Sequence, residues 1–316
     1  MTTKKILNWF ISEKGQHASY ILAGTIATLT PAAYFVSHTI FLEQYKKFKT
    51  LYSKGFSVPV PEELLKRFDE TLELLKVPSI RRTDCRPFMT SGFDICSAGS
   101  GYSRFGIIVG LPNNFMYNDV DSLDKPRIKV NLESVNWELP ASNQLLESLI
   151  FSENAQKYAI ARELRYRESV KPLIDVFLTT TALLMTYGLS RLLNTKFNLY
   201  VKHRIVRLGM YGLVSLLSFG NYFLCKDAIE HYYEEAIDEE LKKTSPIFVE
   251  GGKEYYSNII KRNIALRELM GKEGRNLYSP SGNVNYLFRQ KHIPLVDRKG
   301  FFETDSSQKT NISNPS

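Results

Sequence analysis

The sequence predicts an α+β integral membrane protein, and the main reason is how apolar residues are distributed along its 316 residues. Three stretches, 19–42, 173–193 and 208–225, are long and apolar enough to cross a bilayer as helices. The rest is polar, mixes helix-like and strand-like patterns, and brings the mean hydropathy of the chain to −0.22. We therefore expect an N-terminal anchor helix, a mixed α/β soluble region, a transmembrane helical hairpin and a helical C-terminal region.

The composition of the three stretches supports membrane crossing. A hydrocarbon core about 30 Å thick needs about 20 helical residues at roughly 1.5 Å each. The first and third stretches contain no Asp, Glu, Lys or Arg, and the second has Asp175 and Arg191 only near its ends. These two residues are too far apart to meet, so each is expected to snorkel or to pair with a neighbouring helix. Inside lipid each backbone amide must pair within its own segment, so all three are predicted to be helices.

Two crossings separate the soluble portions, so both are expected on the same side of the membrane. Lys and Arg are about equally frequent on the two sides, so the positive-inside rule does not choose that side. The predicted division is an N-terminal segment 1–18, an anchor 19–42, a soluble α+β region 43–171, a hairpin 172–225, a C-terminal helical region 226–303 and a disordered tail 304–316.

The first soluble region is expected to combine helices and strands. Pro61 to Lys76 has proline at the first helical position and an apolar stripe, which predicts a helix. Phe105 to Leu111 is a short apolar run, typical of a buried strand. Ile128, Val130 and Leu132 alternate with polar residues, which favours a half-exposed strand. The pattern returns to helix from Ser142 onward.

A second helix is expected to begin near Ser152 and to be separated from the hairpin by Pro172. Beyond Cys225 the chain is acidic, and the third span could continue as a helix out of the lipid until Gly251 and Gly252 break it. Tyr255 to Met270 is predicted to form another amphipathic helix. Tyr278 to Asn283 has turn chemistry that suits either a docking loop or a structural cap.

The net charge of +8 does not indicate nucleic-acid binding, because the basic residues flank the apolar stretches instead of forming one soluble patch. Three cysteines do not make a disulfide framework. Cys225 is expected to be an apolar filler at the end of a span. Cys85 and Cys96 are expected to be structural thiols, and a disulfide or a transient copper contact is the alternative.

Several blocks of this chain, in their order and spacing, resemble the transmembrane protein 177 family. The resemblance covers most of the chain and is weakest in the first 60 residues and the tail. The blocks are AQKYAIARELRYRES at 155–169, GGKEYY at 251–256, NIALRELMGKEG at 263–274, LYSPSGN at 277–283 and LFRQKHIP at 287–294.

The resemblance implies a multi-pass protein of the mitochondrial inner membrane with a non-catalytic role in complex IV biogenesis. Its implied partners are newly made cytochrome c oxidase subunit II and the chaperone that escorts it, and the chain would stabilise both. It implies no catalysis and no metal site, and we expect no cofactor, no small-molecule substrate and no nucleic acid as partners. We accordingly predict no catalytic, cofactor-binding or metal-binding residues.

A membrane-bound zinc metallopeptidase is the main alternative, with a general scaffold for membrane complexes as another. The order of strand, helix, hairpin and acidic helix resembles such peptidases, which carry HExxH before the hairpin and an acidic ligand after it. Here the corresponding segment, 162–166, reads Arg-Glu-Leu-Arg-Tyr. Glu163 matches the general base, but arginine and tyrosine replace both histidine ligands, and a guanidinium repels zinc. We therefore expect no hydrolysis, and at most a degenerate metallopeptidase-like fold.

Overall fold

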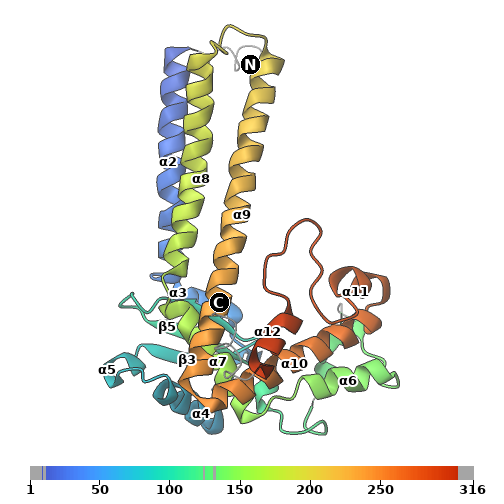
Figure 1. Ribbon diagram of the computed structural model, residues 1–316. Coiled ribbons are helices and arrows are strands. Elements are labelled where there is room, and N and C mark those ends of the chain that lie inside the picture. Colours follow the sequence, from blue (N-terminus) through green and yellow to red (C-terminus); the bar gives the residue numbers. More distant parts are fainter. Residues whose placement is uncertain (1–8, 10–11, 124, 131–132, 305–316) are drawn as a thin grey trace, which may run out of the picture. The chain divides into compact units, whose positions relative to one another are not determined.

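The computed structural model describes residues 9, 12–123, 125–130 and 133–304 (Figure 1). The chain divides into two compact units. The membrane unit comprises residues 1–41 and 170–230, and the soluble unit comprises residues 42–169 and 231–316. Most of the predicted tail, 305–316, and Leu132 of the predicted strand lie outside the described residues.

The membrane unit contains three long helices, α2 (Glu13–His38), α8 (Lys171–Lys196) and the first part of α9 (Arg204–Thr244). Helices α2 and α8 pack side by side (Figure 1), and side-chain contacts such as the hydrogen bond from Asn194 to Tyr211 link α8 to α9. Each is long and apolar enough to cross a membrane. Helix α2 begins earlier than predicted because Ser12 caps it, accepting a hydrogen bond from the Gly15 N–H at 3.3 Å. It also ends earlier, at His38, and Leu42 already belongs to α3 (Leu42–Lys49).

Two further expectations for the membrane unit are corrected. Pro172 lies in the first turn of α8, where its missing N–H costs no hydrogen bond, and the preceding helix ends earlier, at Glu168. Asp175 pairs with Lys171 of its own helix at 2.6 Å, not with a neighbouring helix. The same Lys171 ammonium lies 2.9 Å from Glu230 on α9, so it joins α8 to α9.

The soluble unit is built around a three-stranded sheet of order β3-β5-β4. Strand β5 (Ile107–Pro112) is central and buried throughout, as its apolar run predicts. It pairs in parallel with β3 (Cys85–Thr90) and antiparallel with β4 (Cys96–Gly99). Two short hairpins are separate from this sheet, β1 (Tyr52–Ser53) with β2 (Phe56–Ser57), and β6 (Lys129–Val130) with β7 (Glu133–Ser134).

Helices form the rest of the soluble unit, and the largest share a core with the sheet. The core includes Phe68, Leu111, Tyr158, Phe248 and Tyr256. The helices not yet given are α4 (Glu62–Leu74), α5 (Ser79–Arg82), η1 (Asn113–Met116), η2 (Lys125–Arg127), α6 (Pro140–Ser148), α7 (Glu153–Glu168), α10 (Pro246–Leu269), α11 (Gly271–Leu277) and α12 (Leu295–Glu303).

The expected helix break at Gly251 and Gly252 is wrong. Helix α9 does continue past the apolar stretch, but it ends at Thr244, and both glycines lie inside α10. Ser245 and Pro246 make the break, because the Ser245 side chain caps α10 and proline suits the first turn. The glycines serve packing instead, since a Cβ on Gly251 would overlap the backbone carbonyl of Asn154 on α7.

Candidate functional site

Polar side chains meet in the interior of the soluble unit, at the junction of four helices. Arg162 comes from α7, Glu234 and Asp238 from α9, Tyr256 from α10 and Arg298 from α12. All but Arg162 are at most 4% exposed. Buried charges are costly unless they are paired and hydrogen-bonded, so their convergence requires explanation. We call these five residues the buried ion-pair cluster.

Asp238 is the most heavily hydrogen-bonded member. Its carboxylate accepts from the hydroxyls of Tyr158 at 2.6 Å and Tyr256 at 3.1 Å, and Arg298 donates to it from Nε at 2.8 Å. The Arg298 guanidinium also lies 4.7 Å from the centre of the Tyr256 ring. Burial, followed by the Asp238 charge, raises the pKa of Tyr158, so its hydroxyl stays protonated and keeps donating.

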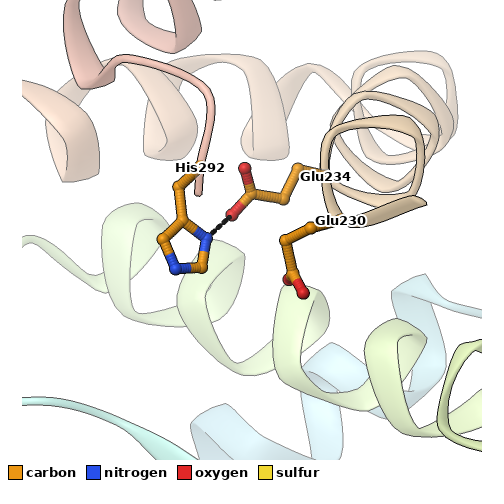
Figure 2. Close-up of side chains that lie close together, drawn as sticks. All are labelled: Glu230, Glu234 and His292. Atoms are coloured by element: carbon orange, nitrogen blue, oxygen red, sulfur yellow. Dashed lines mark hydrogen bonds and ion pairs between the residues drawn. The ribbon is translucent and has the colours of Figure 1, made fainter. Parts of the chain in front are cut away.

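Glu234 lies one helical turn before Asp238 and faces three donors. Figure 2 shows its carboxylate directed at the His292 imidazole, whose Nδ1 is 3.0 Å away. The Ile293 N–H donates to it at 2.9 Å, and Arg298 forms an ion pair at 3.2 Å. Burial alone would raise the pKa of Glu234, but the His292 hydrogen bond and the charges of Arg298 and Arg162 outweigh it and lower the pKa to about 2. The carboxylate is therefore ionised throughout the physiological range.

Arg162 occupies the position that the metallopeptidase comparison assigns to a zinc ligand. Its guanidinium lies 3.9 Å from Glu234 and 4.0 Å from Glu163, so it bridges two carboxylates. Glu163 accepts a hydrogen bond from the Ser97 hydroxyl of β4 at 2.6 Å. Arg167 donates to the same serine from Nε at 2.9 Å. Glu163, which matches the general base of those peptidases, is thus engaged in contacts with Arg162 and Ser97.

A cavity of about 210 Å³ adjoins the cluster. Its polar lining includes Arg162, Glu234, Gln290, His292 and Arg298, and its apolar lining includes Ile259. Cavities that bind drug-sized ligands usually have about 300–1,000 Å³. This one is too small for an extended peptide substrate.

One member of the cluster, Glu234, lies near two further potential metal ligands, but the charges around them do not favour a divalent cation. Glu230, Glu234 and His292 are the residue types that bind metals, and Figure 2 shows Glu230 one turn before Glu234 on α9. However, Lys171 already pairs with Glu230, and two guanidinium groups lie within 4 Å of Glu234. A divalent ion at Glu234 would face these positive charges at short range. The metal-free assignment stays a prediction.

Cys85 and Cys96 are free thiols on β3 and β4, with β5 between the two strands. Burial, with a contribution from Glu168, raises the pKa of Cys85 to about 11, and burial also raises the pKa of Cys96. Both therefore stay protonated near neutral pH, whereas the thiolate is the nucleophile and the metal ligand. The structural interpretation of these residues agrees with this chemistry better than the copper alternative does.

Sequence reasoning did not find the buried ion-pair cluster. Its signal was present in the acidic stretch after Cys225, where Glu234 and Asp238 are four residues apart and Ile237 and Leu241 share the buried side of the helix. The turn at 278–283 has a clear structural role, because the Gly282 carbonyl accepts a hydrogen bond from the buried Asn263 side chain at 2.8 Å.

The fold and the site together define a membrane protein with three candidate spans and a soluble α+β unit closed by a buried ion-pair cluster. The chain belongs to the transmembrane protein 177 family, whose model matches residues 11–298.

Named relatives agree with this membership. Transmembrane protein 177 of Homo sapiens is 31% identical over 90% of this chain and 91% of the relative. The Xenopus laevis protein of the same name is 31% identical over 87% and 91%. The Danio rerio protein is 30% identical over 84% of each. No solved structure matches the chain.

Proposed function

We propose that this chain is a non-catalytic assembly factor of the mitochondrial inner membrane. In this role it stabilises newly made cytochrome c oxidase subunit II together with the chaperone that escorts it. Membership of the transmembrane protein 177 family over residues 11–298 carries the proposal, because the sequence blocks that place the chain in this family also imply that role.

A polar position in the third span supports a helix-binding role. Asn221 is exposed on α9, and its Oδ1 accepts only a weak contact from Cys225 Sγ at 4.0 Å. Leu213, Leu217 and Leu224 are exposed on the same side of the helix. An amide exposed to lipid is costly, and membrane helices satisfy such groups by hydrogen bonding to a partner helix. An incompletely assembled subunit with exposed spans would provide one.

Affinity capture tests the proposal directly. Tagged chain is captured from mitochondria after pulse-labelling of newly translated products, and the labelled subunit II is quantified. We expect wild-type chain to capture labelled subunit II and its chaperone, and we expect Asn221→Leu to lower capture about fivefold, in line with about 1 kcal/mol for one interhelical hydrogen bond. Thr180→Val is the matched control, because its hydroxyl already bonds to Val176 of its own helix.

Absence of subunit II from the captured material, together with an unchanged lifetime of subunit II on depletion of the chain, would refute the proposal. Capture of other membrane complexes without subunit II would support the general scaffold instead.

A zinc peptidase is disfavoured by the residues at the corresponding position. Arg162 and Tyr166 stand where the two histidine ligands would be, and Glu163 bonds to Ser97. We therefore propose that the chain cleaves no peptide bond, whether or not its fold derives from such enzymes. Metal analysis of the purified chain checks this: stoichiometric zinc that is lost in Glu163→Ala would establish the peptidase alternative.

A further inference from the structure

The hairpin end of the membrane unit contains a cavity of about 560 Å³. It lies where α2 begins, α8 ends and α9 begins, so residues from all three helices line it. Its polar lining includes Arg191, Asn194, Tyr200, Arg207 and Tyr211. Because the apolar stretches of α8 and α9 end here, this part of the unit is expected at the level of the lipid headgroups.

Two guanidinium groups line the cavity, and no acidic residue does. Arg207 is only 6% exposed, and its guanidinium lies 6.0 Å from the centre of the Tyr200 ring. Arg191 lies over the ring of Tyr20 at 5.8 Å. Neither arginine forms an ion pair with a carboxylate in the described part of the chain, and residues 1–8 and 10–11 contain no acid. Burial of the Arg207 charge without a counter-ion costs free energy, so we expect an anion to bind in the cavity.

The neutral groups of the cavity also match an anion. Asn194 is 4% exposed, and its Nδ2 donates to the hydroxyls of Tyr211 at 2.6 Å and Tyr200 at 3.3 Å. Each phenol acts there as the acceptor, so its own hydrogen remains available for another acceptor. The Oδ1 atom of Asn194 is buried and has no hydrogen-bond partner in the described structure. It would accept from a hydroxyl group.

The lining also contains the neutral polar residues Gln16, Ser19, Thr186 and Ser190, and its apolar part continues toward the middle of the spans. Ala23 and Ile26 come from α2, Leu183 from α8, and Leu208 and Phe219 from α9. A free inorganic ion would leave this surface uncovered, whereas an acyl chain would cover it. The combination of basic polar end and apolar continuation is that of a site for a lipid.

We propose that this cavity binds one anionic glycerophospholipid. Its phosphate lies between Arg191 and Arg207 and accepts hydrogen bonds from the hydroxyls of Tyr200 and Tyr211. A headgroup hydroxyl donates to Asn194 Oδ1, and an acyl chain covers the apolar lining. Guanidinium binds phosphate through charge-assisted, often bidentate hydrogen bonds. With two cations and no acid in the lining, the site prefers a lipid of net negative charge to a zwitterionic one.

Native mass spectrometry and thermal unfolding of the full chain in detergent test the site. Phosphatidylglycerol, phosphatidylcholine and inorganic phosphate are titrated separately. Wild-type chain should retain one phosphatidylglycerol molecule, with at least about tenfold higher affinity than for phosphatidylcholine. Arg191→Gln and Arg207→Gln should each lower that affinity about tenfold and reduce the thermal shift that the lipid produces. Lys202→Gln is the matched control, because Lys202 is an exposed cation of the same hairpin outside the cavity.

Arg191 is exposed, so its variant reports on binding even if Arg207→Gln does not fold. Equal affinity for the two lipids, or unchanged phosphatidylglycerol binding in Arg191→Gln, would overturn the proposal. Displacement of the lipid by millimolar inorganic phosphate would assign the cavity to free phosphate and would overturn the lipid assignment as well.

Discussion

Arg298 is the residue on which both buried carboxylates of the ion-pair cluster depend. Its guanidinium lies 3.2 Å from Glu234 and 2.7 Å from Asp238. A buried ion pair contributes little net stability compared with an apolar pair of the same size, but loss of one partner costs about 3–5 kcal/mol. Arg298 therefore ties α12 to α9, because a displaced α12 would leave two buried negative charges without this partner.

The low pKa of Glu234 predicts acid sensitivity of the fold. In the folded chain this pKa is about 2, below the ordinary value of 4.5 for a glutamate. The unfolded chain therefore binds the proton more readily, and the stabilisation from Glu234 is complete above pH 5. It is lost as the pH falls from 4.5 toward 2, and its upper limit is about 3 kcal/mol. Urea unfolding of the chain in detergent between pH 7 and pH 3 measures the loss.

Glu234→Gln should flatten the part of the pH dependence that lies below pH 4.5 and should lower the stability at pH 7. Glu235→Gln is the control, because Glu235 is the next residue on α9 but is exposed. If Glu234→Gln keeps the full wild-type slope below pH 4.5, the titration of Glu234 is not the cause of the acid sensitivity.

Helices α7 and α10 of the soluble unit approach each other closely, and Gly251 makes this approach possible. A Cβ at this position would overlap the Asn154 carbonyl and would lie 3.0 Å from Cβ of Tyr158. The Tyr158 hydroxyl donates a hydrogen bond to Asp238, so the crossing also positions a hydrogen-bond donor to the buried ion-pair cluster. Small residues permit such close approach, and here the approach places a polar network at the centre of the unit.

Gly251→Ala should destabilise the chain by about 1–3 kcal/mol, because the backbone of α7 must move away and cannot adapt as a flexible side chain would. Gly300→Ala is the matched control. Gly300 also lies in a helix, α12, and a Cβ there meets no atom within 4 Å. That variant should be neutral or more stable by up to about 1 kcal/mol, because alanine favours helix over glycine. Thermal unfolding of both variants decides: equal loss of stability in the two would show that the crossing is not tight.

The sequence predicted those helices and strands that depend on local pattern. The buried strand β5 follows from its apolar run, and α4 follows from its proline start and its apolar stripe. The break predicted at Gly251 and Gly252 was wrong, although glycine is a poor helix former in isolation. At Gly251 the small size of glycine is required by α7, which comes far earlier in the chain and packs against α10. The cluster was missed for a related reason: Asp238 and Arg298 are 60 residues apart, and only tertiary packing pairs them.

Helix α9 contributes to both units of the molecule. Its residues up to 230 belong to the membrane unit, and residues 231–244 belong to the soluble unit and supply both carboxylates of the cluster. The soluble unit is assembled from segments before α8 and after the apolar part of α9, so the chain leaves it and returns to it through two candidate spans. We therefore expect both segments on one side of the membrane and the connection between α8 and α9 on the other.

Site-directed labelling tests this topology in sealed membrane vesicles. Arg104→Cys and Lys291→Cys introduce exposed thiols in the two segments of the soluble unit, and Lys202→Cys introduces one between α8 and α9. We expect a membrane-impermeant maleimide to label the first two variants in vesicles of one orientation, and the third only in vesicles of the opposite orientation. Labelling of the wild-type chain is subtracted as the background from its own cysteines. Of these, Cys85 and Cys96 are partly buried and have raised pKa values. Labelling of Lys202→Cys and Lys291→Cys from the same side would contradict two crossings by α8 and α9, and the lipid site at the hairpin end would then lose its membrane context.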